Sequence, residues 1–146
     1  MTAPRNRKQV KAYDKHLAEV EPPSKGCSFC AINKGSPQFV TETKSFKVIR
    51  NIFPYSLWDS QPVKDHLMLI PKRHTDTLAD LTPAAAQEFV KLLSSYESKG
   101  YSVYARAPGS VIKTVLHQHT HLIKHGDKVI KGLLYLRKPY VRLVIQ

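Results

Sequence analysis

The pattern of apolar and polar residues along the chain predicts several short strands and one main helix. Apolar residues cluster in Phe39–Thr41 and Ser45–Ile52 on either side of polar residues 42–44, which is typical of a β-hairpin. His66–Ile70 is an apolar run that ends at a proline, as expected of a buried central strand. Residues 56–64, between these strands, are predicted to form a loop.

The helix is predicted in the second half of the chain. Thr82 is a favourable N-cap, Pro83 suits the first helical position, and Gly100 is expected to end the helix. Residues with helical spacing are predicted to form a stripe that faces the core, namely Phe89, Val90, Leu92, Leu93 and Tyr96.

The remaining apolar segments predict four strands, at Tyr101–Ala105, Val111–Ile123, Val129–Leu136 and Tyr140–Ile145. The last two are expected to form an extra hairpin or a strand that stabilises a dimer. Near the N-terminus, Arg7–Val20 fits a short helix or a flexible arm equally well. Together the elements predict an α+β domain, with an antiparallel sheet, one main helix and short helices.

Composition narrows the class of protein. The chain has 146 residues, of which 42% are hydrophobic, enough for a single core. Its 23 Lys and Arg residues against 11 Asp and Glu residues give a net charge of +12, which favours polyanionic ligands such as nucleotide phosphates, nucleic acid or an acidic membrane surface. It has neither a long apolar run nor the apolar core of a signal peptide, so we expect a cytoplasmic protein without a membrane segment.

Three histidines, His117, His119 and His121, occupy alternate positions. On a strand their side chains would share one face, about 6.5 to 7 Å apart. An imidazole can act as nucleophile, acid, base or metal ligand near neutral pH. The spacing therefore predicts one wall of a functional site, with a purely structural metal wall or chance spacing on a solvated strand as the alternatives.

The two cysteines form the motif Cys27-x-x-Cys30. Without an export signal, this spacing indicates half a metal site or a redox pair more than a structural disulfide. It follows the segment Pro22–Gly26 rather than a strand, which favours a zinc knuckle over a thioredoxin-like motif. Zinc prefers four ligands, so two histidines from elsewhere would have to complete the site. The alternative is two free thiols packed at the N-terminal edge.

Residues His117–Ile123 resemble the signature of the histidine triad family, in which three histidines alternate with apolar residues. Gln118 and Thr120 depart from that pattern. The resemblance extends over roughly Cys27–Ile123. Residues 51–55 are similar to the Asn-x-[Phe/Tyr]-Pro-[Tyr/Phe] element of the branch that contains diadenosine tetraphosphate phosphorylases and galactose-1-phosphate uridylyltransferase. The resemblance implies a two-fold dimer.

The resemblance also implies roles for individual residues. His119 would be the nucleophile, giving a nucleotidyl-histidine, and His121 would hydrogen-bond phosphate or leaving-group oxygens. His117 would belong both to this catalytic group and to the zinc site. In zinc-bearing relatives the corresponding four ligands are Cys27, Cys30, His74 and His117.

Four further residues are candidates for binding substrate. Asn51 would accept the ribose hydroxyls, with a turn-initiating role as an equal alternative. Arg106 and Thr114 would contact phosphate or the leaving group. Because Arg106 stands where the family often has Asn or Gln, its bidentate grip favours an oligophosphate leaving group. Lys113 would add charge, although a solvated position on the far face of the strand is the favoured interpretation. Trp58 is expected to cover the core rather than to stack on substrate.

The sequence therefore predicts a basic N-terminal arm at 1–26, a histidine triad domain at 27–124 and a β-rich extension at 125–146. The predicted function is that of a nucleotidyl hydrolase or transferase acting at the α-phosphate of nucleoside phosphate conjugates, preferably dinucleoside polyphosphates. Structural zinc and a homodimer are expected. The alternatives are aprataxin-like removal of AMP from nucleic acid ends through the basic surface, and a zinc- or nucleotide-binding module without turnover.

Overall fold

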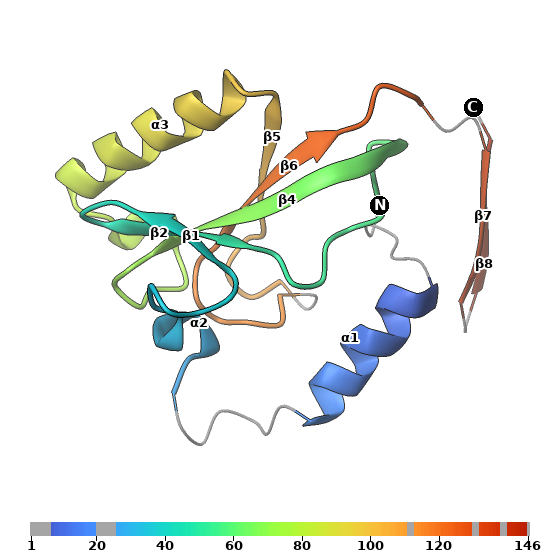
Figure 1. The fold of residues 1–146 in the computed structure, drawn as a ribbon, viewed down its shortest axis with the longest axis horizontal. Coiled ribbons are helices and arrows are strands. Elements are labelled where there is room, and N and C mark those ends of the chain that lie inside the picture. Colours follow the sequence, from blue (N-terminus) through green and yellow to red (C-terminus); the bar gives the residue numbers. More distant parts are fainter. Residues whose placement is uncertain (1–6, 20–25, 111–112, 130–131, 138–139, 146) are drawn as a thin grey trace.

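A six-stranded antiparallel sheet forms the centre of the molecule (Figure 1). The structure is a computed structural model and describes residues 7–19, 26–110, 113–129, 132–137 and 140–145. The strand order is β1-β2-β4-β6-β5, and β3 pairs with β4 outside this path. The strands are β1 (Phe39–Glu42), β2 (Phe46–Arg50), β3 (Leu57–Trp58), β4 (Gln61–Pro71), β5 (Tyr101–Ala105) and β6 (Thr120–His125). The helices are α1 (Arg7–Glu19), α2 (Ser28–Ala31), the 3₁₀ helix η1 (Leu78–Asp80) and α3 (Pro83–Glu97).

Helix α3 covers one face of the sheet (Figure 1). As predicted, Thr82 caps it, because its hydroxyl accepts a hydrogen bond from the backbone N–H of Ala85 at 3.3 Å. The segment after the helix turns at Gly100, which has a φ of +82°. Val90 is 64% exposed, so its predicted place in the core-facing stripe is wrong. The core on this face contains Phe46, Val48, Leu67, Leu69, Ala85 and Leu122, against which Leu81, Phe89, Leu92, Leu93, Tyr96 and Tyr101 pack.

The opposite face of the sheet packs on α2 and carries the chemistry. Its apolar cluster consists of Ile32, Ile49, Met68 and Ile70, with Phe29 and Phe39 packed against it. Side chains alternate between the two faces along a strand, so His66 lies on the same face as Met68. The register pairs Met68 with His121 and so brings that histidine to the same face. The strand β4 is central and buried, as its apolar run predicted, and it connects the core to the candidate site.

Two predicted segments differ from the structure. Among the described residues, the strand predicted at Val111–Ile123 begins only at Thr120. There β5 ends at Ala105, and the backbone N–H of Gln118 donates to the carbonyl of Thr75 at 2.6 Å instead of pairing with β4. His117 and His119 therefore precede the strand instead of lying on it. The loop predicted at 56–64 is a hairpin of β3 and β4, whose turn residues Asp59 and Ser60 have φ values of 46° and 60°.

The two ends of the chain contain the remaining elements. Helix α1 packs Tyr13 and His16 against the ring of Phe53, with ring centroids 5.3 and 4.9 Å apart. Strands β7 (Gly132–Arg137) and β8 (Tyr140–Ile145) form a separate two-stranded sheet. This is the extra hairpin that was one of the two predictions for these segments. In the described part of the chain, every helix is too short or too polar to cross a bilayer.

Candidate active site and metal centre

A pair of buried histidines lies at the centre of the site. His66 on β4 and His121 on β6 are joined by a bond of 2.9 Å between Nε2 of His66 and Nδ1 of His121. Nδ1 of His66 accepts the backbone N–H of Tyr55 at 3.2 Å, so this nitrogen carries no proton. His66 therefore donates through Nε2 to Nδ1 of His121. In this arrangement Nε2 of His121 bears the proton and can donate a hydrogen bond to a substrate.

His66 was not among the site residues predicted from the sequence. The available signal was its place at the start of the apolar run His66–Ile70 that ends before Pro71, which resembles the family's Gly-His segment with Asp65 in place of glycine. Sequence spacing alone does not show that a histidine 55 positions from His121 contacts it. The pairing of β4 with β6 makes that contact.

His119 lies beside this pair, in the irregular segment before β6. Its ring is 5.1 Å from that of His121 and packs edge-on against Phe29 at 5.2 Å. Nδ1 of His119 donates to the backbone carbonyl of His117 at 2.7 Å. The Nε2 atom has no hydrogen-bond partner among the described residues, so its lone pair remains for an electrophile.

The pKa of His119 is lowered, mainly because burial disfavours the charged imidazolium. The positive charges of Lys113 and Arg106 lower it further, against the hydrogen bond to the carbonyl of His117. A lowered pKa keeps the ring neutral, as a nitrogen nucleophile requires.

The charges of two cations, Lys113 and Arg106, thus act on His119. Lys113 is only 7% exposed, so the solvated position favoured from the sequence is wrong. Its Nζ donates to the backbone carbonyl of Asp76 at 2.8 Å and approaches Oε1 of Gln118 at 3.5 Å. Arg106 donates to the hydroxyls of two tyrosines. Among the described residues, no carboxylate forms an ion pair with either cation.

Asn51 and Thr114 are the other predicted substrate-binding residues. Oδ1 of Asn51 accepts the backbone N–H of Phe53 at 2.9 Å, which is the turn-initiating role considered from the sequence. Its Nδ2 lies 3.4 Å from Nδ1 of His66. The second lone pair of Oδ1 remains for a ribose hydroxyl. Thr114 is exposed, next to the buried Lys113.

The four predicted metal ligands converge. The ligand atoms of Cys27, Cys30, His74 and His117 all lie within 4.8 Å of one another. Sγ of Cys27 is 3.4 Å from Nδ1 of His117, and Sγ of Cys30 is 3.4 Å from Nδ1 of His74. In tetrahedral zinc coordination, sulfur and nitrogen ligands are about 3.5 Å apart. The residues therefore fit zinc.

The surroundings of these ligands support the same interpretation. Nε2 of His117 donates to the backbone carbonyl of Pro71 at 2.9 Å, which leaves Nδ1 with a lone pair for a metal. Burial and the neighbouring Cys27 raise the pKa of Cys30, while Lys47 lowers it. Nζ of Lys47 donates to the carbonyls of Phe29, Cys30 and Ile32 at 3.4, 3.3 and 2.5 Å and so fixes the end of α2.

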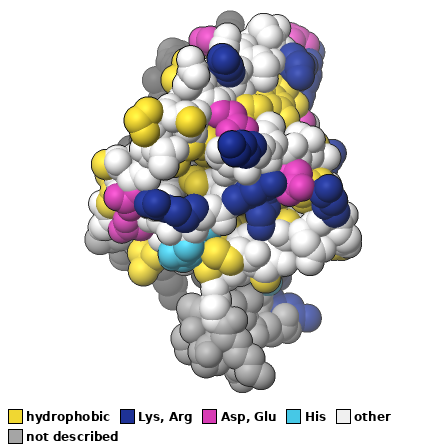
Figure 2. Space-filling view, turned by 90° about the vertical axis from the view of Figure 1, so that its left-hand side faces the viewer, with side chains coloured by type: hydrophobic (Ala, Val, Ile, Leu, Met, Phe, Trp, Pro, Cys, Tyr) yellow, Lys and Arg dark blue, Asp and Glu magenta, His cyan; other side chains and the backbone are white. Residues whose placement is uncertain are grey.

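Charged side chains also tie together the segments near the metal ligands. Lys and Arg side chains lie among Asp and Glu side chains on the side of the molecule shown in Figure 2. Glu42 forms ion pairs with Lys34 at 3.4 Å and with Lys72 at 3.1 Å. The pKa of Glu42 is lowered, mainly by its hydrogen bond with Lys72. The segment after α2 is thereby linked to the segment that leads to His74.

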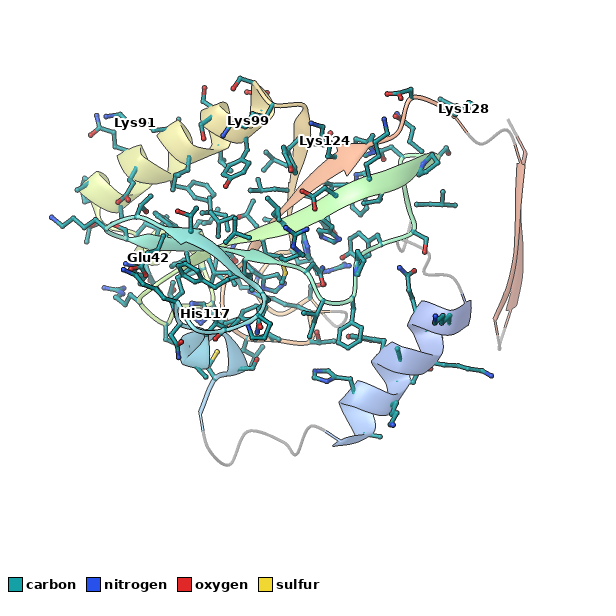
Figure 3. The ribbon with its side chains drawn as sticks, viewed as in Figure 1. Glu42, Lys91, Lys99, His117, Lys124 and Lys128 are labelled. Carbon is teal, nitrogen blue, oxygen red and sulfur yellow. The ribbon has the colours of Figure 1, made fainter. Side chains whose placement is uncertain are left out.

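The three histidines do not line one wall, which corrects the prediction from their spacing. The imidazole of His117 points into the cysteine cluster beside α2 (Figure 3). Only its backbone carbonyl reaches His119. The side chain of His117 therefore joins the cysteine cluster, and its main-chain carbonyl orients the ring of His119.

Comparison with known proteins identifies the family. The sequence matches the HIT domain over residues 36–127. The chain belongs to the HIT domain family. An adenosine 5'-monophosphoramidase of Candida albicans is 33% identical, and the alignment covers 70% of this chain and 72% of that protein.

Solved structures of HIT proteins have the same fold. A HIT family hydrolase from Clostridium thermocellum matches with a TM-score of 0.54 at 23% identity, over 70% of this chain and 93% of that one. A zinc-bound histidine triad family protein from Mycobacterium smegmatis matches with a TM-score of 0.53 at 25% identity, over 79% of this chain and 84% of that one. The predicted α+β fold and the predicted family are both confirmed.

Proposed function

We propose that this HIT protein is a nucleotidyl hydrolase or transferase that acts at the α-phosphate of nucleoside phosphate conjugates, with dinucleoside polyphosphates preferred. Its relatives include a hydrolase and an adenosine 5'-monophosphoramidase, and the chain is an enzyme of this family. The observation that carries the proposal is the pair formed by His119 and His121, whose ring centroids are 5.1 Å apart. His119 offers a nitrogen lone pair, and His121 offers an N–H donor.

In the first half of the reaction, Nε2 of His119 attacks the α-phosphorus. A bond forms between that nitrogen and phosphorus while the bond from phosphorus to the leaving oxygen breaks. The Nε2–H of His121 donates a hydrogen bond to the leaving oxygen, which departs as an anion, and Nδ1 of His121 stays hydrogen-bonded to His66. The product is a nucleotidyl-histidine.

In the second half, water or another acceptor attacks the same phosphorus. The attacking water loses its proton to solvent, the Nε2–H of His121 hydrogen-bonds the phosphate, and the bond from phosphorus to His119 breaks, which returns the neutral ring of His119. A neutral nucleophile is suited to this centre because the substrate phosphates repel anions. Burial and the cations Lys113 and Arg106, which lower the pKa of His119, keep its ring in this neutral form.

The two cations favour a leaving group with several negative charges. Lys113 and Arg106 form no ion pair with a described carboxylate, so their charges remain for substrate. A phosphoramidate releases a neutral amine, so only its α-phosphate would interact with these cations. A dinucleoside polyphosphate releases a nucleotide and would use both cations. The Asn-x-Phe-Pro-Tyr element at 51–55 supports the same branch of the family.

Zinc has a structural role in this proposal. Cys27, Cys30, His74 and His117 would hold it, and its chemistry there is to fix three chain segments that are far apart in sequence. A zinc-bound relative in the family supports this choice of metal. Because His117 also supplies the carbonyl that orients His119, the metal would stabilise the nucleophile's position from outside the reaction.

The remaining proposals concern partners and boundaries. A homodimer is supported by Val103, 44% exposed on the edge strand β5, and by Val90, 64% exposed on α3. The proposed division into 1–26, 27–124 and 125–146 keeps the metal knuckle within the HIT domain. AMP removal from nucleic acid is less well supported, since Lys91, Lys99 and Lys124 lie toward α3 and Lys128 lies beyond the end of β6, all away from His117 (Figure 3).

The decisive experiment measures AMP release from diadenosine tetraphosphate and from adenosine 5'-phosphoramidate. We expect release from both, faster with the first, and loss in His119→Ala. His125→Ala, on the same β6, is the matched control and should retain activity. Mass spectrometry of quenched protein should find a nucleotidyl adduct on His119. Absence of both release and adduct would overturn the proposal in favour of a binding module.

A further inference from the structure

We propose that Tyr55 and Tyr104 are positioning residues that hold Arg106 for an anionic leaving group and thereby set the enzyme's preference among substrates. The inference rests on the function proposed above, because it assigns residues to the leaving-group side of that site. It adds a determinant that the histidine motif does not contain.

Two phenol oxygens hold the guanidinium of Arg106. Its Nη2 donates to the hydroxyl of Tyr55 at 3.1 Å, and its Nη1 donates to the hydroxyl of Tyr104 at 3.3 Å. The guanidinium carbon also lies 5.4 Å from the ring centroid of Tyr104. A guanidinium has five N–H donors, so others remain for a ligand. Because both partners are neutral, they orient the charge without cancelling it.

The hydroxyls are themselves fixed by a cluster of aromatic rings. Trp58 stacks on Tyr55 with centroids 5.5 Å apart and planes at 12°, and it contacts Tyr104 at 4.6 Å. Trp58 lies at the end of β3, directly before the turn residues Asp59 and Ser60 with their positive φ values. Such a turn persists where the surrounding structure determines it. The indole therefore packs against the rings of both tyrosines that hold Arg106.

The same rings place the guanidinium beside the hydrogen-bond donor His121. Tyr55 lies 5.5 Å and Tyr104 lies 5.9 Å from the ring of His121. His121 donates a hydrogen bond to the leaving oxygen in the proposed reaction, so Arg106 adjoins the side from which that group departs. An arginine that is already oriented loses less conformational freedom when it grips phosphate. We infer that the phenol hydroxyls strengthen the binding of charged leaving groups and do not affect the binding of neutral ones.

The test compares Tyr55→Phe, Tyr104→Phe and the double variant, which keep the rings and remove only the hydroxyls. We expect kcat/KM for diadenosine tetraphosphate to fall about 5- to 10-fold in each single variant, from loss of a charge-assisted hydrogen bond. The double variant should approach Arg106→Gln. For adenosine 5'-phosphoramidate, which releases a neutral amine, the change should stay below about 2-fold. If the hydroxyls had a merely structural role, their removal would lower kcat/KM equally for both substrates. That result would overturn the inference.

Tyr101→Phe is the matched control. Tyr101 lies on the same β5 but packs against the α3 core, where its hydroxyl donates to Asp65 at 2.5 Å. Loss of the Tyr101 hydroxyl should leave the ratio of kcat/KM for the two substrates unchanged.

A binding measurement keeps the inference separable from the proposed function. Inorganic tripolyphosphate, a mimic of the charged leaving group, should bind the wild-type protein about 5- to 10-fold more tightly than the double phenylalanine variant. If neither nucleotide is turned over but this difference appears, the proposed function fails and the positioning role stands. Equal affinities of the two proteins for tripolyphosphate would overturn the positioning role, whatever the turnover.

Discussion

Lys47→Met is expected to weaken the segment that carries the two cysteines. Helix α2 has four residues, too few to be stable alone, and it is held at its end by Nζ of Lys47. That ammonium donates to the carbonyls of Phe29, Cys30 and Ile32, and its shortest bond, 2.5 Å, is to Ile32. Methionine keeps most of the apolar stem and removes the charged donor.

The magnitude follows from these contacts. A hydrogen bond from a charged donor contributes about 1.5–3 kcal/mol. The other two contacts, at 3.3 and 3.4 Å, are long, and the contact to Cys30 is exposed, so water can replace it. We therefore count one full bond and expect the free energy of unfolding of the metal-free protein to fall by about 1.5–3 kcal/mol. If zinc binding must restore α2 to its place, zinc affinity falls by about 10- to 100-fold.

Urea unfolding in the presence of a chelator measures the first quantity, and competition with a chromogenic zinc chelator measures the second. Lys44→Met is the control, because Lys44 is exposed in the turn between β1 and β2 and its loss removes the same charge. Its effect should stay within about 0.5 kcal/mol. Equal unfolding midpoints and zinc affinities for the two variants would refute the role assigned to Lys47.

Three further changes test the fold. The pKa of Glu88 is lowered, mainly by its hydrogen bond with Ser45, so its charged form stabilises the protein above the ordinary carboxyl pKa. Glu88→Gln should lower the unfolding midpoint at pH 7, with a deficit that fades as pH falls through the lowered pKa; a pH-independent deficit, or an equal one in Glu97→Gln, would count against it. Thr82→Ala should cost about 1 kcal/mol in urea unfolding, and Thr82→Ser much less, through loss of the cap. Phe46→Ala, at a fully buried position, should cost about 3–5 kcal/mol; a loss below 1 kcal/mol would contradict its place in the core.

Local sequence signals predicted the elements that local physics controls. The N-cap Thr82 and the apolar run of β4 act within a few residues, so α3 and the central strand could be located from the sequence. The same signals failed where a strand needs a neighbour. Residues 113–119 were predicted to belong to the strand of the triad, but β5 ends at Ala105 and the backbone N–H of Gln118 bonds to Thr75, outside the sheet.

The candidate site shows the same division. The cysteine and histidine spacings predicted the kinds of ligand, and the four proposed metal ligands do converge. The sequence could not show that His117 turns toward the cysteines while His119 faces His121. Nor could it show that His66 contacts His121, or that two tyrosines hold Arg106, because those contacts join segments from different strands and loops.

The sequence by itself determined the family, the kind of fold and the residue types that the chemistry needs, because these follow from short-range patterns of side chains. Only the tertiary structure decided how the histidines divide their work. Strand pairing and burial set which nitrogen of each ring meets which partner, and hence which ring is poised to bind metal, to donate a hydrogen bond or to attack phosphorus.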